Sequence, residues 1–187
     1  MVTWQNKMRS MDRPHLFSFV GAPRTGVEKA AIRDEILRQC AESSQCRMLK
    51  CGRVGASKCH NPKEVLKVMS VSRFCMQAPG DSFTRRSTFD SILAGCIPVF
   101  FSPHTAYTQY EWYLPRDPSE YSVYIPEKKW KQIEKELMKI PKAKMIPRIT
   151  YTHPNATNGK DKKYQDAVDI ALAQLSKHVM MNPIPIQ

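Results

Sequence analysis

The chain has 187 residues, with 29 Lys and Arg against 17 Asp and Glu, and a formal net charge of +12. Hydrophobic residues make up 42% and charged residues 25%, which excludes a disordered or low-complexity chain because there is enough apolar side chain to build a core. No apolar run approaches the roughly 20 residues of a membrane-spanning helix, and residues 1–11 lack the apolar centre of a signal peptide, so we expect a soluble chain of one ordinary domain or two small ones.

Strand-like and helix-like segments alternate along the chain. Apolar runs next to Gly or Pro predict buried strands, and apolar residues at helical spacing predict helices between them. The expected elements are a strand at 16–20, a helix at 27–40, a strand at 47–51, a helix from 62, a strand at 74–76, a helix at 84–94, strands at 97–101 and 121–125, and helices at 130–140 and 164–176.

Helix starts and stops support this order. Thr25 with Glu28 three residues later is a capping-box pattern. Asn61 followed by Pro62 is typical of an N-cap with proline at the first helical position. Gly95 is expected to end the helix at 84–94.

The alternation predicts a fold class: an α/β, Rossmann-like parallel sheet with helices on both faces. Such sheets bind ligands at the carboxyl ends of their strands, often at helix N-termini. The turns that lead from strand to helix are therefore the places to search for a site.

The first such turn contains Gly21 and Arg24. Glycine lets the backbone approach a ligand closely, and an arginine beside a helix N-terminus can hold an anion such as a phosphate. The turn matches neither GxGxxG nor GxxxxGK[ST]. An ordinary turn with a surface arginine explains it equally well.

The turn after the third strand is richer, because it opens a helix with Arg85 and Arg86 in the expected first turn. Positive charge there is unfavourable with the helix dipole unless an anion compensates it, and a diphosphate would do so. Asp90 is placed either to accept hydrogen bonds from a ribose or to pair with Arg86 at helical spacing. The alternative is a charged helix start folded onto Asp81 and Asp90, and the spacing favours neither.

Other catalytic patterns are missing from the sequence. It has no DxD and no GxSxG, and its five histidines form no recognisable triad. We therefore predict no metal site and no cofactor, with a diphosphate held by arginines instead. An aromatic cluster after the fourth strand could stack on sugar or base, although core packing is the more common use; its members are Tyr107, Tyr110, Trp112 and Tyr113.

The positive charge divides between the two flanks. Residues 1–60 and 126–187 each carry a net +6, and residues 61–125 are neutral. A nucleic-acid-binding surface usually gathers its charge into one stripe, so we interpret the flanks as solvated helix faces and predict no nucleic-acid partner.

Six cysteines occur without a CxxC pair, which argues against a zinc ribbon. Three disulfides in an oxidising compartment are favoured over six buried thiols, and both remain open at this point. Asn155 begins a glycosylation sequon that is consistent with the former. The cysteines are Cys40, Cys46, Cys51, Cys59, Cys75 and Cys96.

Residues 74–101 (FCMQAPGDSFTRRSTFDSILAGCIPVFF) closely resemble the exostosin-type glycosyltransferases, and their plant xyloglucan galactosyltransferase branch in particular. Shorter matches lie at 16–24, 57–60, 106–110 and 121–126. The resemblance runs from Arg13 to His178. It implies a nucleotide-sugar-binding domain at 13–178, an amino-terminal extension at 1–12 and a flexible tail at 179–187.

The resemblance implies the carboxyl-terminal, donor-binding half of a GT-B enzyme. Such enzymes are anchored in the Golgi membrane, although no membrane contact is expected from this chain itself. They transfer a sugar with inversion from a nucleotide donor to a polysaccharide acceptor, and the implied reaction here is transfer of galactose from a UDP-sugar to an acceptor such as xyloglucan. Protein glycosylation and cell-wall polysaccharide synthesis are the implied processes. The alternative is a truncated, non-catalytic paralogue that acts as a binding module.

The resemblance also implies roles for single residues. Disulfides are expected to pair Cys75 with Cys96 and, as the simplest local choice, Cys40 with Cys46 and Cys51 with Cys59. The catalytic base is not identified, and Asp81 is expected to stabilise its turn. The expected donor-binding residues are Gly21, Arg24, Lys58, Gly80, Ser82, Arg85, Arg86, Ser87 and Asp90.

Overall fold

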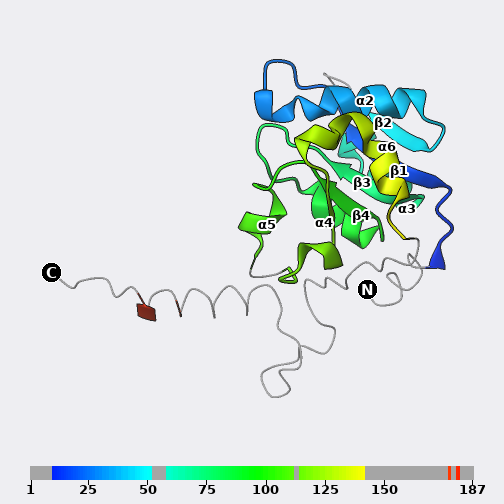
Figure 1. The fold of residues 1–187 in the computed structure, drawn as a ribbon. Coiled ribbons are helices and arrows are strands. Elements are labelled where there is room, and N and C mark those ends of the chain that lie inside the picture. The colour runs from blue at the N-terminus through cyan, green and yellow to red at the C-terminus, as the bar shows by residue number, and fades with distance from the viewer. Residues whose placement is uncertain (1–9, 52–57, 112–113, 142–176, 178–179, 182–187) are drawn as a thin grey trace.

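Five parallel strands form a single sheet in the order β2-β1-β3-β4-β5 (Figure 1). The computed structural model describes residues 10–51, 58–111, 114–141, 177, 180 and 181. The predicted helix at 164–176 and the sequon at Asn155 lie outside these residues. The strands are β1 (His15–Gly21), β2 (Cys46–Lys50), β3 (Ser72–Gln77), β4 (Ile97–Phe100) and β5 (Val123–Tyr124).

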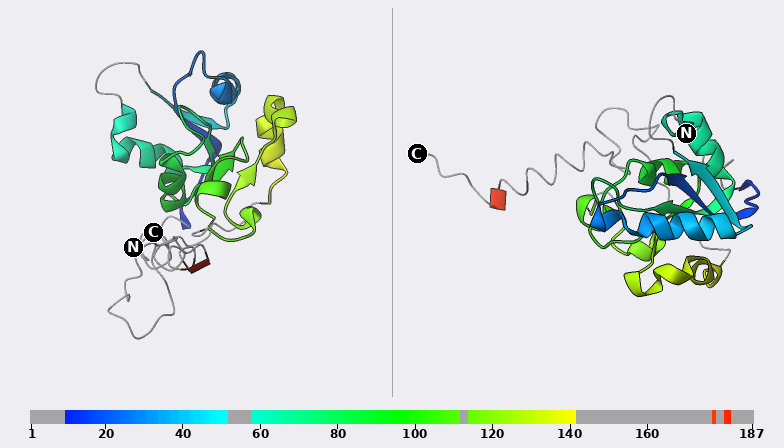
Figure 2. Two further views of the ribbon diagram at one scale, coloured as in Figure 1. Left: turned by 90° about the vertical axis from the view of Figure 1, so that its left-hand side faces the viewer. Right: turned by 90° about the horizontal axis from the view of Figure 1, so that it is seen from above.

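Helices cover both faces of this sheet, which confirms the predicted Rossmann-like class. Figure 2 shows α3 and α4 on one face and α2 and α6 on the other, and α2 contacts α6 while α3 contacts α4. The α-helices are α2 (Ile32–Glu42), α3 (Pro62–Ser70), α4 (Ser87–Leu93), α5 (Ala106–Gln109) and α6 (Ile133–Met138). The 3-10 helices are η1 (Glu28–Ala30), η2 (Lys58–His60), η3 (Pro118–Glu120) and η4 (Glu127–Gln132).

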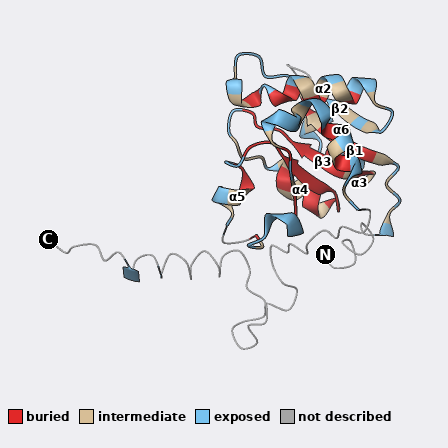
Figure 3. Ribbon diagram, in the orientation of Figure 1, coloured by how far each residue is buried: buried red, intermediate tan, exposed pale blue. Residues whose placement is uncertain are grey.

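The core lies on the three central strands. Figure 3 shows β3 and β4 almost entirely buried, as expected for a parallel sheet covered on both faces. Phe17, Phe74 and Val99 are fully buried and pack against Ile36 and Leu137 from the helices. Each such side chain contributes on the order of 1.5–3 kcal/mol by leaving water, so this packing holds the strand ends in fixed positions.

Two predicted helix boundaries are confirmed. The Asn61 side chain accepts a hydrogen bond from the Lys63 main-chain N–H at 3.0 Å, with Pro62 at the first position of α3. At the end of α4, Gly95 has φ 68°, a left-handed conformation that glycine adopts without strain.

The predicted capping box at Thr25 and Glu28 is wrong. The N-cap residue there is Val27, no side chain caps the turn, and the chain first forms η1 before α2 begins at Ile32. Short 3-10 turns of this kind often precede an α-helix because their i to i+3 hydrogen bonds tighten the entry. The true start of α2 therefore lies five residues later than predicted.

The predicted start of α4 is also wrong. The helix begins at Ser87, with Arg86 at the N-cap and Arg85 before it, so the arginines do not occupy its first turn. The Ser82 hydroxyl donates to the main-chain carbonyl of Thr84 at 2.9 Å, which holds this segment in an irregular loop. The arginines therefore lie at the N-terminal boundary of α4 and in the loop before it, and their positions depend on that loop.

All six cysteines form disulfides, in the three expected pairs: Cys40–Cys46, Cys51–Cys59 and Cys75–Cys96. The first joins the end of α2 to β2, and the third joins β3 to the residue before β4. Within the described ranges, no helix is long and apolar enough to cross a membrane.

Candidate functional site

A cavity of about 830 Å³ opens at the carboxyl ends of β1, β2 and β3. Its walls come from the loop after β1, from the segment around η2 that follows β2, and from the loop between β3 and α4. This is the edge of a parallel sheet at which ligands are expected. The three loops meet there because β1 lies between β2 and β3.

Six of the nine predicted donor-binding residues line this cavity, and three do not. Lys58 is exposed at the start of η2, whose next two residues form part of the wall. Gly80 is buried within the loop after β3. Ser82 is exposed, and its hydroxyl hydrogen-bonds to the main-chain carbonyl and the side-chain hydroxyl of Thr84. The lining members of the predicted set are Gly21, Arg24, Arg85, Arg86, Ser87 and Asp90.

Positive charge exceeds negative charge in the cavity wall. Four arginines face two aspartates. Two of the arginines form ion pairs, Arg24 with Asp81 and Arg86 with Asp90, each at 3.5 Å. Both pairs are solvent-exposed and therefore weak. The lining charges are Arg24, Arg33, Arg85, Arg86, Asp81 and Asp90.

These pairs leave two charges of the cavity wall uncompensated: Arg33 carries one and Arg85 the other. In the part of the chain that the structure describes, no carboxylate lies within ion-pair distance of Arg85. Burial lowers the pKa of the Arg85 guanidinium, and the nearby charge of Arg24 lowers it further, while Asp81 opposes the effect. A half-buried cation of this kind attracts an anion.

Of the two interpretations left open for this turn, the structure tests only the charged helix start folded onto Asp81 and Asp90, and that interpretation is partly right. Arg86 does fold back onto Asp90, as the structural alternative expected. Arg85 does not fold onto Asp81, whose carboxylate reaches across the cavity to Arg24 instead. Asp81 thus links the loop after β3 to the loop after β1.

The sequence interpretation missed Arg33, which lies in the first turn of α2 and is only 2% exposed. Burial lowers the pKa of its guanidinium to about 10, helped by the charges of Arg85 and Arg24 and opposed by Asp81. A signal was present in the sequence, because residues at i+3, i+4 and i+7 from Arg33 are all apolar. An arginine on the apolar side of a helix indicates a buried, hydrogen-bonded charge.

Gly80 lies where the two buried guanidinium groups meet. A β-carbon at Gly80 would lie 2.6 Å from Nη1 of Arg85 and 3.2 Å from Nη2 of Arg33. The lack of a side chain therefore lets both cations approach the same stretch of backbone.

Gly21 is required for a different reason. A β-carbon at Gly21 would lie 2.5 Å from the end of the Phe19 ring. This contact does not test the predicted role, in which Gly21 allows a ligand to approach the backbone. Phe19 in turn lies below the Arg33 guanidinium, whose central carbon is 5.7 Å from the ring centroid.

Ser87 is held in place from inside the sheet. Its hydroxyl donates to the Gln77 side-chain oxygen at 2.6 Å, and Gln77 is almost completely buried at the end of β3. This bond fixes the first residue of α4 against the strand that precedes the loop. The arginines between them are therefore anchored at both ends of their segment.

The aromatic cluster packs as core where it is described. Tyr107 and Tyr110 contact a buried group around Phe100, and the Tyr107 hydroxyl lies 3.0 Å from Ser122 Oγ. Burial raises the pKa of Tyr107. Trp112 and Tyr113 fall outside the described residues.

No cluster of three or more metal-ligating side chains occurs within the described ranges. The cavity wall instead offers guanidinium groups, a histidine and hydroxyls. Its chemistry suits hydrogen bonding to anionic oxygens.

The fold and this cavity define a doubly wound α/β domain with a cationic site at the carboxyl edge of its sheet. The chain matches the exostosin GT47 domain over residues 1–142 and belongs to that family. The resemblance seen in residues 74–101 is thereby confirmed.

Three plant relatives from Arabidopsis thaliana are similar over most of this chain. It is 60% identical to the probable xyloglucan galactosyltransferase GT17, covering 98% of this chain and 42% of that protein. It is 44% identical to the xyloglucan galactosyltransferase MUR3, covering 90% and 29%. It is 39% identical to the xyloglucan-specific galacturonosyltransferase 1, covering 94% and 28%. The chain thus spans less than half the length of these relatives.

Proposed function

We propose that this chain binds the nucleotide-sugar donor of an exostosin-family glycosyltransferase that transfers galactose from UDP-galactose to xyloglucan. One observation carries the donor part of the proposal: the half-buried, unpaired Arg85 beside Arg24 and Arg33 in a cavity with excess positive charge. A diphosphate supplies the missing negative charge, because guanidinium groups bind its oxygens through charge-assisted hydrogen bonds.

The remaining lining groups fit the rest of the donor. Asp90 has a second oxygen to offer a ribose hydroxyl besides the one near Arg86. The arginines neutralise the diphosphate without a metal ion, so donor binding needs no cofactor. Galactose and xyloglucan are supported by the names of two relatives. The galacturonosyltransferase among them marks a uronic-acid donor as the alternative sugar.

In the transfer itself, these residues would stabilise the leaving UDP. As the bond between the sugar and the diphosphate breaks, negative charge grows on the diphosphate, and preorganised arginines stabilise that charge. An inverting transfer also needs a base for the acceptor hydroxyl. The three disulfides fit an oxidising compartment, which supports a location in the Golgi lumen.

The test is UDP binding measured by titration calorimetry. We expect wild-type protein to bind, Arg85→Ala to lose about tenfold to a hundredfold in affinity, and Arg86→Ala to lose less because its charge is already paired. Arg47→Ala removes an exposed arginine of β2 that does not line the cavity, and it should bind normally. Affinity should be the same with EDTA as with magnesium. Folded wild-type protein that does not bind UDP would contradict the proposal.

The alternative is a non-catalytic module that binds partners or glycans. Release of UDP from UDP-galactose in the presence of xyloglucan oligosaccharide, by this chain alone, would exclude it.

A further inference from the structure

Arg33 holds main-chain atoms of two different loops with a single guanidinium group. Its Nη1 donates to the carbonyl oxygen of Ala22 at 2.8 Å. Its Nε donates to that of Pro79 at 2.5 Å, and its Nη2 to that of Ala78 at 3.3 Å. All three acceptors are neutral, so these bonds satisfy the donors of the group without cancelling its charge.

The two loops held in this way are those that carry Arg24 and Arg85 of the cavity wall. Ala22 is two residues before Arg24 in the loop after β1. Pro79 is six residues before Arg85 in the loop after β3. The two strands are neighbours in the sheet, so the position of one guanidinium sets the distance between the loops at the carboxyl edge.

We propose that Arg33 is a positioning residue for the donor diphosphate: it fixes the spacing of the loops that carry Arg24 and Arg85, and its own uncancelled charge adds to their attraction for the anion. This inference rests on the proposed function and assigns a role to an almost completely buried residue of the cavity wall.

The shape of the group is essential to this role. A planar guanidinium presents donors in three directions at once, whereas the ammonium of a lysine at this position is a compact point charge. The Phe19 ring packs against the guanidinium at 5.7 Å and restricts its orientation. Arginine is therefore not replaceable by lysine here, although the charge would be kept.

The chain supplies a matched control in Arg13. This residue also donates to three main-chain carbonyls, those of Met69, Ser72 and Ala94, at 3.4, 2.9 and 2.8 Å. These acceptors lie at the amino ends of β3 and β4, at the opposite edge of the sheet. Loss of Arg13 should therefore destabilise the fold without reaching the cavity.

The experiment compares full-length Arg33→Met, Arg33→Lys and Arg13→Met by titration calorimetry with three probes: inorganic diphosphate, UDP and uridine. We expect Arg33→Met to lose about tenfold or more in affinity for diphosphate and UDP, while its affinity for uridine changes less than about twofold. Arg33→Lys should fall between wild type and Arg33→Met. Arg13→Met should lower the melting temperature to a similar extent and bind all three probes as wild type does.

Equal loss of UDP and uridine binding in Arg33→Met would mean a purely structural role and would overturn the inference, as would unchanged diphosphate binding. If Arg33→Met does not fold, Arg33→Lys decides the matter, because wild-type affinity for diphosphate in that variant contradicts the need for the forked group. Wild-type protein that binds diphosphate but not UDP would contradict the proposed function and leave the role of Arg33 standing. Wild-type protein that binds neither contradicts both.

Discussion

At the amino edge and at the carboxyl edge of the sheet, an arginine donates to main-chain carbonyls, but the two arginines have different surroundings. At the amino edge, Arg13 donates to the main-chain carbonyls of Met69, Ser72 and Ala94, and it does not line the cavity at the carboxyl edge. At the carboxyl edge, Arg33 also donates to three carbonyls, but it forms part of the wall of a cavity that contains three further arginines. Burial lowers the pKa of both guanidinium groups.

The difference lies in the neighbours. The pKa of Arg33 is lowered further by Arg85 and Arg24, whereas burial alone accounts for the lowered pKa of Arg13. At both edges, an arginine thus joins segments of the main chain by donating to their carbonyls. Around Arg33, other cations gather without enough carboxylates to pair them, which marks the cavity as a candidate binding site.

The largest expected effect is a loss of stability of the whole domain, which does not distinguish the two edges of the sheet. Replacing Cys75 and Cys96 together by alanine opens a loop with a sequence separation of 21 residues. A chain-entropy estimate gives a loss of about 3 kcal/mol in the free energy of unfolding. Urea denaturation would measure it. The affinity of the folded variant for UDP should stay unchanged, and a parallel loss of affinity would show that the bridge acts on the cavity.

The second effect concerns the amino edge alone. Arg13→Met removes the guanidinium hydrogen bonds to the carbonyls of Met69, Ser72 and Ala94, which should cost about 2 kcal/mol of stability. Urea denaturation measures this loss, and calorimetry with UDP supplies the control. A fall in UDP affinity as large as that of Arg33→Met would mean that the two edges are not independent.

The sequence was sufficient to predict the strands of the sheet and six of the residues that line the cavity. Strands at residues 16–20, 74–76 and 97–101 were predictable because each is a short apolar run beside Gly or Pro. The parallel arrangement followed from the alternation with helices. The order β2-β1-β3-β4-β5 was not predicted, because it depends on packing between segments far apart in the chain.

Local signals failed where tertiary contacts compete with them. Thr25 and Glu28 have a capping pattern, but the chain forms a 3-10 turn at Glu28–Ala30 without a side-chain cap. The helix expected from Thr84 starts at Ser87, where a buried partner, Gln77, fixes the hydroxyl. Arg33 was missed because its acceptors are main-chain carbonyls, which no side-chain motif reveals. Whether the predicted residues bind a donor stays a prediction.

The third effect sharpens the comparison at the carboxyl edge. Gly80→Ala places a methyl group 2.6 Å from Nη1 of Arg85, which must move, while Arg33 need shift only slightly. Because the displaced atom is the end of a flexible side chain, stability should change by less than about 1 kcal/mol. UDP affinity should fall on the order of tenfold, the worth of one charge-assisted hydrogen bond. Calorimetry and urea denaturation of the same sample separate the two quantities.

Wild-type UDP affinity in Gly80→Ala would mean that the position of the Arg85 guanidinium does not matter for binding. A loss of several kcal/mol in stability would instead indicate that Arg33 had been displaced from its carbonyl acceptors.

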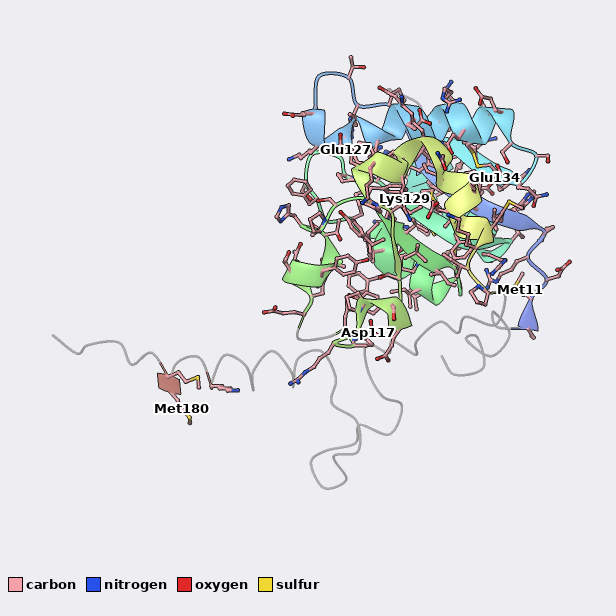
Figure 4. All side chains as sticks on the ribbon, in the orientation of Figure 1. Met11, Asp117, Glu127, Lys129, Glu134 and Met180 are labelled. Carbon is pink, nitrogen blue, oxygen red and sulfur yellow. A yellow bond between two sulfur atoms is a disulfide. The ribbon has the colours of Figure 1, made fainter. Side chains whose placement is uncertain are left out.

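The smallest effect belongs to a third group of charges, on the outside of the segment η4–α6. Here Glu136 accepts from Lys129 at 2.7 Å and from Lys139 at 2.5 Å. Figure 4 labels Lys129 and Glu134 on this segment. The hydrogen bond from Lys129, and then that from Lys139, lower the pKa of Glu136 from 4.5 to about 2. These cations are paired with a carboxylate, in contrast to Arg85 at the cavity.

The lowered pKa fixes the direction of the pH dependence. Because the folded state holds the Glu136 carboxylate ionised, its stabilising effect is complete above the ordinary pKa of 4.5 and is lost as the pH falls through about 2. Glu136→Gln should therefore be less stable than wild type at pH 7 and equal to it near pH 2, as judged by urea midpoints. Glu134→Gln is the matched control, because Glu134 has no ion pair within the described residues. A Glu136→Gln deficit that persists unchanged at pH 2 would mean that packing of the side chain, and not its charge, stabilises this face. Neither variant should change the affinity for UDP, because salt screens the charges of this surface segment from an anion in the cavity.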